Sequence, residues 1–414
     1  MRPLLQLNRN ALTILRQNSL HHTPPATAIP SYRLNQLRFQ PTQQTRQLTL
    51  LQTLLAPPLT FGGLLLALWT LKSVSLVVFQ NKIIYLPYLP PYCRSEPLPE
   101  PTKRIEWKDL GHIEGGRRYK WGGGKVQLNI SGTEVVVGGT STLGVTAADP
   151  QREVLVVYFQ GNAGNAPMRI PLFNDFLISP LLDTKKPQKP WKLSLLYPSF
   201  RGYWTSTGTA TGWGLREDIP HLLRWIKSET DKRRQGGRDV KLVVWGQSIG
   251  SMIAAELAGR AEKEGVEVEG LILETPFTTL SDLVKEVYPQ RWIPYGYLTR
   301  FLEVDWDLEE GLRRWTGEGK EGRRRKRVLV VQAEKDELVG ERIGEEVRKM
   351  VGGLNVEKVV VGVRGAGHQG CVNREGGTAI ARFLEGLIQR RVSDRSSWHS
   401  SYILIAFRYA SLYD

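Results

Sequence analysis

The sequence predicts an α/β fold in which a mostly parallel central sheet carries helices on both faces. Two observations lead to this expectation. From about residue 105 onward, apolar runs of strand length alternate with helical stretches, as in sheets built from strand–helix repeats. The apolar runs are continuous rather than interrupted by polar residues at every second position, which is typical of strands buried on both faces.

The expected elements follow in chain order. An antiparallel hairpin is expected first, at residues 126–130 and 133–137. Six continuous apolar runs then predict buried strands, at residues 154–159, 193–197, 240–245, 270–273, 328–331 and 359–361. Helices are expected between them, at residues 215–227, 251–258 and 343–350. In such sheets the side chains that carry chemistry lie beyond the carboxyl ends of the strands.

An aromatic-rich segment at residues 276–315 interrupts this repeat. Two interpretations stay open for it. It forms either a lid over a site at the end of the sheet or an ordinary pair of surface helices.

Length, charge and cysteine content narrow the function classes. The chain has 414 residues and a net charge of +15, and a chain of this length buries a core without disulfides. Nine Lys or Arg residues precede the first acidic residue, Glu96. A basic cluster at 322–327 stands directly before an apolar run, so we interpret it as a solvated loop. Because no nucleic-acid-binding module accompanies these charges, no nucleic acid partner is expected. With only Cys93 and Cys371 present, neither a disulfide framework nor a zinc site is expected.

Residues 1–48 form a basic tail without acidic residues. This composition fits a mitochondrial presequence, and it fits a disordered cytosolic tail in front of a signal anchor equally well. Residues 49–80 are long and apolar enough for a transmembrane anchor. Lys72 is the only charge between residues 54 and 79 and would have to snorkel to the membrane surface. The alternative is a core helix of a soluble domain. Residues 80–92, rich in Tyr and Pro, are expected to form an irregular interfacial segment.

The pentapeptide Gly246-Gln-Ser-Ile-Gly250 lies between an apolar run and a helical stretch. Strand, sharp turn and helix are the context of a nucleophile elbow, in which the serine adopts a strained backbone conformation. A Cβ at either glycine is expected to clash with the neighbouring strand or helix. Ser248 is therefore the candidate nucleophile.

A serine hydroxyl needs a base to remove its proton. Of the six histidines, only His368 follows a strand and lies in a glycine-rich loop, where it is able to reach Ser248. A carboxylate that orients the imidazole is expected between Ser248 and His368 in the chain. Asp336 fits best, and Glu334 and Glu337 are the competing carboxylates. The backbone N–H groups of Asn162 and Ile249 are the candidate oxyanion donors.

Five motifs occur in a consistent order: 160–165 (QGNAGN), 199–203 (SFRGY), 246–250 (GQSIG), 334–336 (EKD) and 365–368 (GAGH). Together they resemble the α/β-hydrolase superfamily, and most of all the membrane-anchored serine hydrolases of the α/β-hydrolase-domain group, which includes bud-emergence-type fungal proteins. The resemblance covers roughly residues 80–390. It implies an α/β-hydrolase fold with a triad of Ser248, Asp336 and His368 and an oxyanion hole at Asn162 and Ile249.

The sequence departs from that family at two places. Gln160 stands before Gly161 where such proteins usually carry histidine, so the polar contacts behind the oxyanion loop are expected to differ. The tail at residues 391–414 does not match the family's ending, and we assign it no role. The hydrolase domain is therefore expected at residues 81–390.

The resemblance implies a serine hydrolase that cleaves acylglycerols, lysophospholipids or acyl thioesters without cofactor or metal. The lipid bilayer and a lipid-like ester are the expected partners, and the oligomeric state is left open. Alternatives are a serine peptidase or protein thioesterase, and a catalytically idle hydrolase fold that serves as a membrane scaffold. A single-pass location in an endomembrane of the endoplasmic-reticulum type or in mitochondria is expected. In a lumen, Asn129-Ile-Ser131 would be a glycosylation acceptor.

Overall fold

The computed structural model describes residues 50–138, 150–183, 189–317, 326–373 and 375–389. The expectations for the tails at 1–48 and 391–414, and for most of the basic cluster at 322–327, lie outside these residues. The chain divides into two compact units, Met1–Thr60 and Phe61–Asp414. In the first, the described residues 50–60 are all helical.

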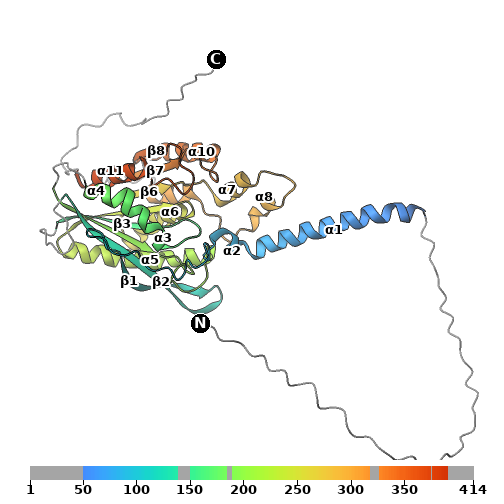
Figure 1. The fold of residues 1–414 in the computed structure, drawn as a ribbon, viewed down its shortest axis with the longest axis horizontal. Helices are drawn as coiled ribbons and strands as arrows, with labels where there is room; N and C mark the ends of the chain where they lie inside the picture. The colour runs from blue at the N-terminus through green and yellow to red at the C-terminus, as the bar shows by residue number, and fades with distance from the viewer. Residues whose placement is uncertain (1–49, 139–149, 184–188, 318–325, 374, 390–414) are drawn as a thin grey trace, which may run out of the picture. The chain divides into compact units, whose positions relative to one another are not determined.

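An eight-stranded sheet forms the centre of the second unit (Figure 1), in the order β1-β2-β4-β3-β5-β6-β7-β8. From β3 onward every neighbouring pair is parallel, while β2 pairs antiparallel with both β1 and β4. The fold class is thus the predicted one, a mostly parallel α/β sheet of the α/β-hydrolase type. The strands are β1 (Lys108–Tyr119), β2 (Gly122–Val137), β3 (Arg152–Phe159), β4 (Trp191–Pro198), β5 (Asp239–Gln247), β6 (Gly270–Glu274), β7 (Arg327–Ala333) and β8 (Glu357–Val363).

The expected hairpin at residues 126–130 and 133–137 is wrong. Both runs belong to the single strand β2, which continues through Ser131 and Gly132 and pairs with β1. Gly132 does not turn the chain; instead, a Cβ there would stand 2.9 Å from side-chain atoms of Leu110 and Leu196. Close packing between neighbouring side chains, rather than a turn, accounts for this glycine.

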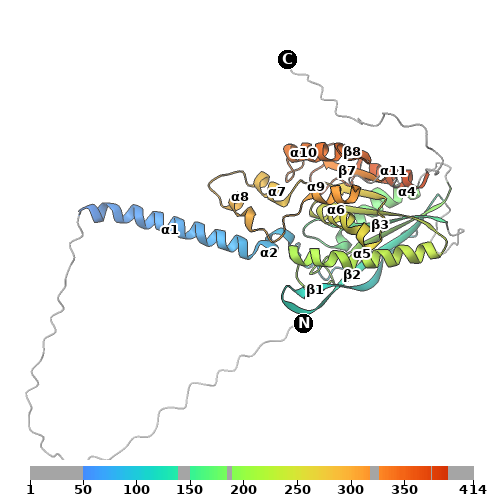
Figure 2. The same ribbon diagram turned by 180° about the vertical axis from the view of Figure 1, so that it is seen from behind.

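Helices cover both faces of the sheet (Figures 1 and 2), and each face has its own apolar core. Strand β3 shows why, because successive side chains of a strand point to opposite faces. Leu155, Val157 and Phe159 join the core beneath α5 (Gly212–Gln235), α6 (Ile249–Ala261), α9 (Leu308–Thr316) and α10 (Glu341–Gly352). Val154, Val156 and Tyr158 join the opposite core, beneath α3 (Ala166–Phe173), the π-helix η1 (Asn174–Ile178), α4 (Ser179–Leu182) and α11 (Glu375–Gln389).

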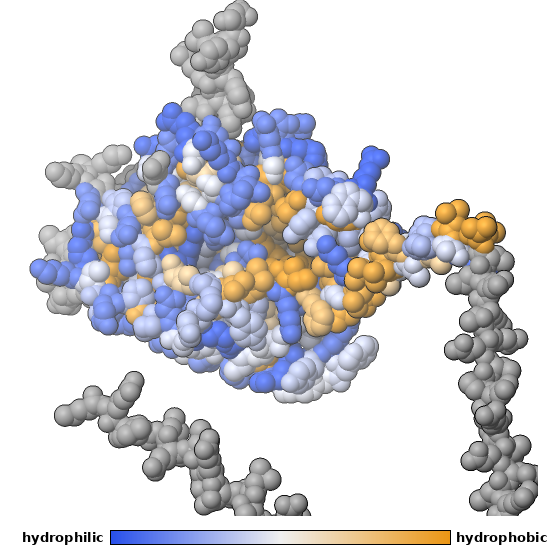
Figure 3. Space-filling model, turned by 45° about the vertical axis from the view of Figure 1, so that its right-hand side comes forward, coloured by the Kyte–Doolittle hydropathy of each residue, from blue (hydrophilic) through white to orange (hydrophobic). Residues whose placement is uncertain are grey.

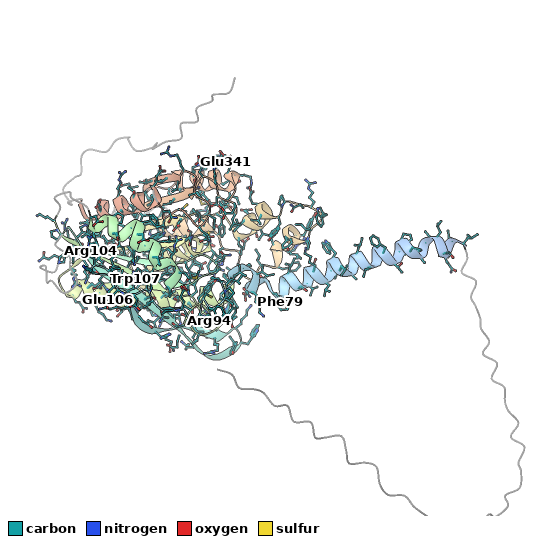
Figure 4. The ribbon with its side chains drawn as sticks, viewed as in Figure 1. Phe79, Arg94, Arg104, Glu106, Trp107 and Glu341 are labelled. Atoms are coloured by element: carbon teal, nitrogen blue, oxygen red, sulfur yellow. The ribbon has the colours of Figure 1, made fainter. Side chains whose placement is uncertain are left out.

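Helix α1 (Leu50–Val78) is long and apolar enough to cross a membrane, with a mean hydropathy of 1.8 in its most apolar stretch. Its side chains are almost all exposed, unlike those of a core helix. The next residues, expected to be irregular, begin with a short helix, α2 (Gln80–Tyr85), before the chain becomes a series of turns. Figure 4 labels Phe79 at the junction of α1 and α2.

The aromatic-rich segment has two different parts. Its second part belongs to the domain core, because Trp306, Leu308, Leu312 and Trp315 are buried where α9 packs on α6. Its first part lies more exposed and contains α7 (Leu280–Val287), α8 (Tyr295–Leu298) and the 3₁₀ turn η3 (Thr299–Phe301). The second part is therefore core rather than lid, and a lid role for the exposed part of residues 276–315 stays a prediction. A 3₁₀ turn, η2 (Glu262–Glu264), follows α6.

Candidate active site

Ser248 occupies the sharp turn between β5 and α6, with φ 52° and ψ −121°. This backbone conformation is rare for a residue with a side chain and costs of order 1–3 kcal/mol. The two glycines of the pentapeptide permit the turn. A Cβ at Gly246 would lie 2.1 Å from the carbonyl oxygen of Gly250, and one at Gly250 would lie 2.2 Å from that of Phe159. Both spacings are far inside contact distance, so glycine is required at each position.

The structure brings Ser248, His368 and Asp336 together. His368 Nε2 lies 2.8 Å from Ser248 Oγ, and His368 Nδ1 lies 2.9 Å from both carboxylate oxygens of Asp336. His368 is fully buried and Ser248 nearly so. A hydroxyl, an imidazole and a carboxylate in this order form the arrangement that activates a serine as a nucleophile. Their catalytic roles stay a prediction at this point.

The loop after β7 holds the carboxylate in place. Asp336 Oδ1 accepts hydrogen bonds from the backbone N–H groups of Leu338, at 2.9 Å, and Val339, at 2.8 Å. The two competing carboxylates have a different task. Glu337 accepts from the N–H of His368 at 2.9 Å, and Glu334 accepts from the N–H of Gly365 at 2.8 Å. They fix the backbone of the histidine loop, while Asp336 contacts the imidazole.

The two predicted oxyanion donors lie beside the serine. Ile249 is the first residue of α6, where backbone N–H groups have no partner within the helix. Asn162 follows Gly161, whose Cβ position is 3.5 Å from Ser248 Cβ. The loop after β3 therefore passes close to the hydroxyl. Role assignments for both N–H groups stay predictions.

Backbone carbonyls from the segment after α1 hold this oxyanion loop. The N–H of Ala163 donates to the Tyr85 carbonyl at 3.1 Å, and the N–H of Gly164 donates to the Leu89 carbonyl at 2.7 Å. The hydroxyl of Tyr203, from the 199–203 motif, also donates to the Tyr85 carbonyl. Ala163 has a positive φ, which is unfavourable for a residue with a side chain, and these outside hydrogen bonds hold the loop in that conformation.

Gln160 replaces the family's usual histidine with a neutral bridge. Its side-chain oxygen accepts from the Tyr197 hydroxyl at 2.7 Å, and its amide nitrogen donates to the Ala163 carbonyl at 3.1 Å. These two contacts support the oxyanion loop from behind, and their difference from the family's pattern stays a prediction. The loop keeps a support that does not ionise.

Comparisons with known proteins find relatives among α/β-hydrolase-domain proteins. No protein-family model matches the sequence. Protein bem46 of Schizosaccharomyces pombe is 27% identical over 201 residues, which is 48% of this chain and 56% of that protein. The α/β-hydrolase domain-containing protein WAV2 of Arabidopsis thaliana is 26% identical over 59% of this chain and 66% of its own length. The lysophosphatidylserine lipase ABHD12 of Danio rerio is 28% identical over 36% of this chain and 37% of that protein.

The chain is thus similar to α/β-hydrolase-domain proteins, among them a protein of the bud-emergence type, as the motifs predict. The chain spans less than two thirds of the length of each of these relatives.

The sequence analysis did not predict a buried ion pair beneath the nucleophile turn. Arg169, on α3, donates to Glu274 at 2.6 Å, and both side chains are buried. Burial alone would lower the pKa of Arg169, but the charge of Glu274 raises it above its ordinary value. The backbone carbonyl of Glu274 accepts from the N–H of Ser248 at 2.8 Å. The only signal in the sequence was a carboxylate directly after the apolar run at 270–273.

A further buried group near the site is the Cys371 thiol. Burial, with the nearby carboxylates of Glu274 and Asp336, raises its pKa well above the ordinary value. The thiol therefore stays protonated at neutral pH and is a poor nucleophile. Among the histidines that the structure describes, His112 is exposed on β1 and His221 lies within α5. Only His368 reaches the serine among them.

Proposed function

We propose that this chain is a membrane-anchored serine hydrolase that cleaves carboxylic ester or thioester bonds of lipid-like substrates. The observation that carries the proposal is the line of contacts from Ser248 through His368 to Asp336. The similarity to a lysophosphatidylserine lipase supports lysophospholipids as a substrate class, beside acylglycerols and acyl thioesters.

The first half of the reaction acylates the serine. The Ser248 hydroxyl gives its proton to His368 Nε2 as the oxygen attacks the substrate carbonyl. The Nδ1–H of His368 donates to Asp336, which holds the tautomer and stabilises the imidazolium. The N–H groups of Ile249 and Asn162 stabilise the negative oxygen of the tetrahedral intermediate. When the intermediate collapses, the carbon–oxygen or carbon–sulfur bond breaks and His368 returns the proton to the leaving group.

The second half releases the acyl group. His368 takes a proton from a water molecule, and the resulting oxygen nucleophile attacks the acyl-enzyme carbonyl in the same oxyanion site. The bond to Ser248 Oγ breaks, the serine regains its proton from His368, and the carboxylic acid leaves. The chemistry uses only side chains and backbone groups of this chain.

Helix α1 supplies the proposed anchor. Its length and apolar composition fit a single span, and the basic residues before it favour a cytosolic tail if that tail is retained. The domain would then face a lumen of the endoplasmic-reticulum type, whereas cleavage of the tail as a presequence would place the domain in mitochondria. Co-fractionation of the protein with endoplasmic-reticulum or mitochondrial markers distinguishes the two locations.

Asn129 cannot report on this topology. Its side chain is fully buried in the middle of β2 and donates to Asp109 at 2.8 Å, so the expected glycosylation at this position does not fit the fold. A glycan needs an exposed asparagine.

The proposal is tested by turnover of monoacylglycerol, lysophospholipid and acyl-thioester substrates by detergent-solubilised protein. We expect the wild type to hydrolyse at least one class and Ser248→Ala to lose that activity while keeping its thermal unfolding midpoint. Cleavage of peptides or protein thioesters alone would favour the peptidase or protein-thioesterase alternative. Equal turnover by both proteins would refute the mechanism, and a folded wild type without any turnover would favour the scaffold alternative.

A further inference from the structure

An apolar groove lies next to the point where α1 ends. Its walls come from the last turn of α1 and from α2 on one side, and from α7, α8 and η3 on the other. The cavity measures about 110 Å³ and its wall atoms are mostly carbon. Side chains that form the apolar walls include Leu76, Val77, Ile84, Val284, Leu298 and Leu302. The groove therefore suits an apolar occupant of small cross-section.

Polar contacts fasten the two walls to each other. The Gln80 side chain donates to the Phe301 carbonyl at 3.1 Å and accepts from the N–H of Glu303 at 2.8 Å. Farther along α1, the Trp69 indole N–H donates to the Trp292 carbonyl at 3.3 Å. The Lys72 ammonium lies 5.2 Å from the centre of the Tyr295 ring, so the one charge in the apolar helix faces an aromatic ring. These contacts hold the two walls of the groove at a fixed spacing.

One wall of the groove continues in the chain into the residue that supports the oxyanion loop. Ile84 lines the groove, and the next residue, Tyr85, accepts the N–H of Ala163 through its carbonyl. The Tyr85 side chain is buried, and its hydroxyl accepts from the Trp306 indole N–H at 3.0 Å. Consecutive Cα atoms are about 3.8 Å apart. The groove wall and the support of the oxyanion loop are therefore neighbours in the chain.

Large apolar side chains surround the groove and remain exposed. Trp292 is 78% exposed, and Figure 3 shows hydrophobic residues gathered where the end of α1 meets the domain. Exposed Trp and Tyr residues next to an apolar span are typical of the zone between hydrocarbon and water. The other exposed apolar residues in this region are Val74, Val78, Phe79, Ile83, Tyr288, Tyr297 and Phe301.

We propose that this groove binds the single acyl chain of a membrane lipid whose ester or thioester carbonyl is presented to Ser248. The inference rests on the proposed function and deepens it. An acyl chain fits because the walls offer few polar groups, whereas an extended peptide would need partners for its backbone N–H and C=O groups. Because Leu76 and Val77 belong to the helix proposed to span the membrane, the chain reaches the groove along α1 without crossing water.

The groove gives the substrate specificity that the triad lacks. Each buried methylene adds roughly fourfold to binding, so esters with longer chains gain affinity from the groove. Acetyl esters are too short to use it. Chain-length preference is thus a property of residues outside the triad and oxyanion loop.

The experiment compares acetyl and decanoyl esters of p-nitrophenol with wild-type protein and with Leu298→Trp, which fills the groove. The matched control is Leu110→Trp, because Leu110 is an exposed leucine on β1, away from the groove. We expect Leu298→Trp to lose at least tenfold in kcat/KM for the decanoyl ester while the acetyl ester and fluorophosphonate labelling stay within twofold. Leu110→Trp is expected to match wild type throughout. Parallel chain-length profiles for all three proteins would overturn the proposal.

A binding measurement separates this proposal from the proposed function. A lysophospholipid with a photoreactive diazirine in its acyl chain is crosslinked to the full-length Ser248→Ala protein in detergent. We expect crosslinked peptides from residues 76–85 or 280–302, and competition by unlabelled lysophospholipid. This binding test needs neither catalytic turnover by the wild type nor a folded Leu298→Trp variant, so it can succeed or fail independently of both. Crosslinks found only outside these two segments would overturn the acyl-chain site.

Discussion

The nucleophile turn and the oxyanion loop face each other at the same edge of the sheet, but they are held in different ways. The turn at Ser248 depends on its own motif, because a side chain at Gly246 or Gly250 would meet backbone atoms, and on one outside contact, the Glu274 carbonyl that accepts the Ser248 N–H. The loop at Ala163 is fixed from a distance, by carbonyls of Tyr85 and Leu89 that follow the apolar helix. The position of the nucleophile therefore depends largely on the short motif at residues 246–250. The geometry of the other half depends on the segment that joins the domain to α1.

The largest effect is expected on the locally fixed half. Asp336→Asn keeps the size of the side chain but removes the charge that orients His368, and we expect kcat to fall by about 10⁴-fold. Steady-state kinetics with a short soluble ester measures the loss. Glu334→Gln is the control, since Glu334 contacts the loop backbone only. A decrease in kcat of less than tenfold for Asp336→Asn would show that Asp336 does not orient the His368 imidazole for catalysis.

A second variant tests the support beneath the nucleophile turn. Arg169→Met leaves the buried carboxylate of Glu274 without its partner, and we expect a loss of about 3–5 kcal/mol in the free energy of unfolding. The double variant Arg169→Met with Glu274→Leu removes both charges and is expected to recover most of that stability. Denaturant unfolding monitored by tryptophan fluorescence provides the measurement. If the single variant is as stable as wild type, the pair does not support the turn.

A third variant tests the distant anchoring of the oxyanion loop. Tyr203→Phe removes a hydrogen bond to the Tyr85 carbonyl, and we expect kcat to fall about three- to tenfold with KM within twofold. The expected loss of stability is about 1 kcal/mol. Tyr158→Phe is the matched control, because its hydroxyl donates to Gln247 at 3.2 Å on the side of the nucleophile turn. Equal effects of both variants on kcat would remove the distinction between the two halves.

The last variant lies at the opposite end of β5, the strand that leads to Ser248, where no effect on catalysis is expected. Burial raises the pKa of Glu269 to about 7, although its carboxylate accepts the N–H of Leu242 at 2.9 Å. Because the folded pKa exceeds the unfolded value of 4.5, this group stabilises the fold below pH 4.5. That contribution is lost as the pH rises through 7.

Glu269→Gln removes this dependence and keeps an acceptor for the Leu242 N–H. We therefore expect the variant to be about 1–2 kcal/mol more stable than wild type at pH 8 and equal to it near pH 4.5. Thermal unfolding at the two pH values gives the comparison. Kinetic constants at pH 8 should be unchanged. A variant that is less stable than wild type at pH 8 would contradict the sign of the shift.

The sequence predicted the features that depend on local pattern. Continuous apolar runs located six strands, and the pentapeptide around Ser248 located the turn between β5 and α6. The glycine-rich loop and the post-strand turn located His368 and Asp336, which the fold brings within hydrogen-bonding distance of one another.

Features that depend on contacts between distant segments were not predictable. The two apolar runs at 126–130 and 133–137 were interpreted as a hairpin, but they form one strand, and Gly132 between them packs against Leu110 and Leu196. The Arg169–Glu274 pair and the carbonyl supports of the oxyanion loop join residues that lie far apart in the chain. No local pattern marks such partners.

The most direct test of the account is labelling of the detergent-solubilised protein by a fluorophosphonate probe, beside Ser248→Ala. A fluorophosphonate reacts with a serine only when a base activates its hydroxyl. The account predicts strong labelling of the wild type and none of the variant, with equal thermal unfolding midpoints. Absence of labelling in a folded wild-type protein, or equal labelling of both, would contradict the claim that Ser248, His368 and Asp336 form an active nucleophile.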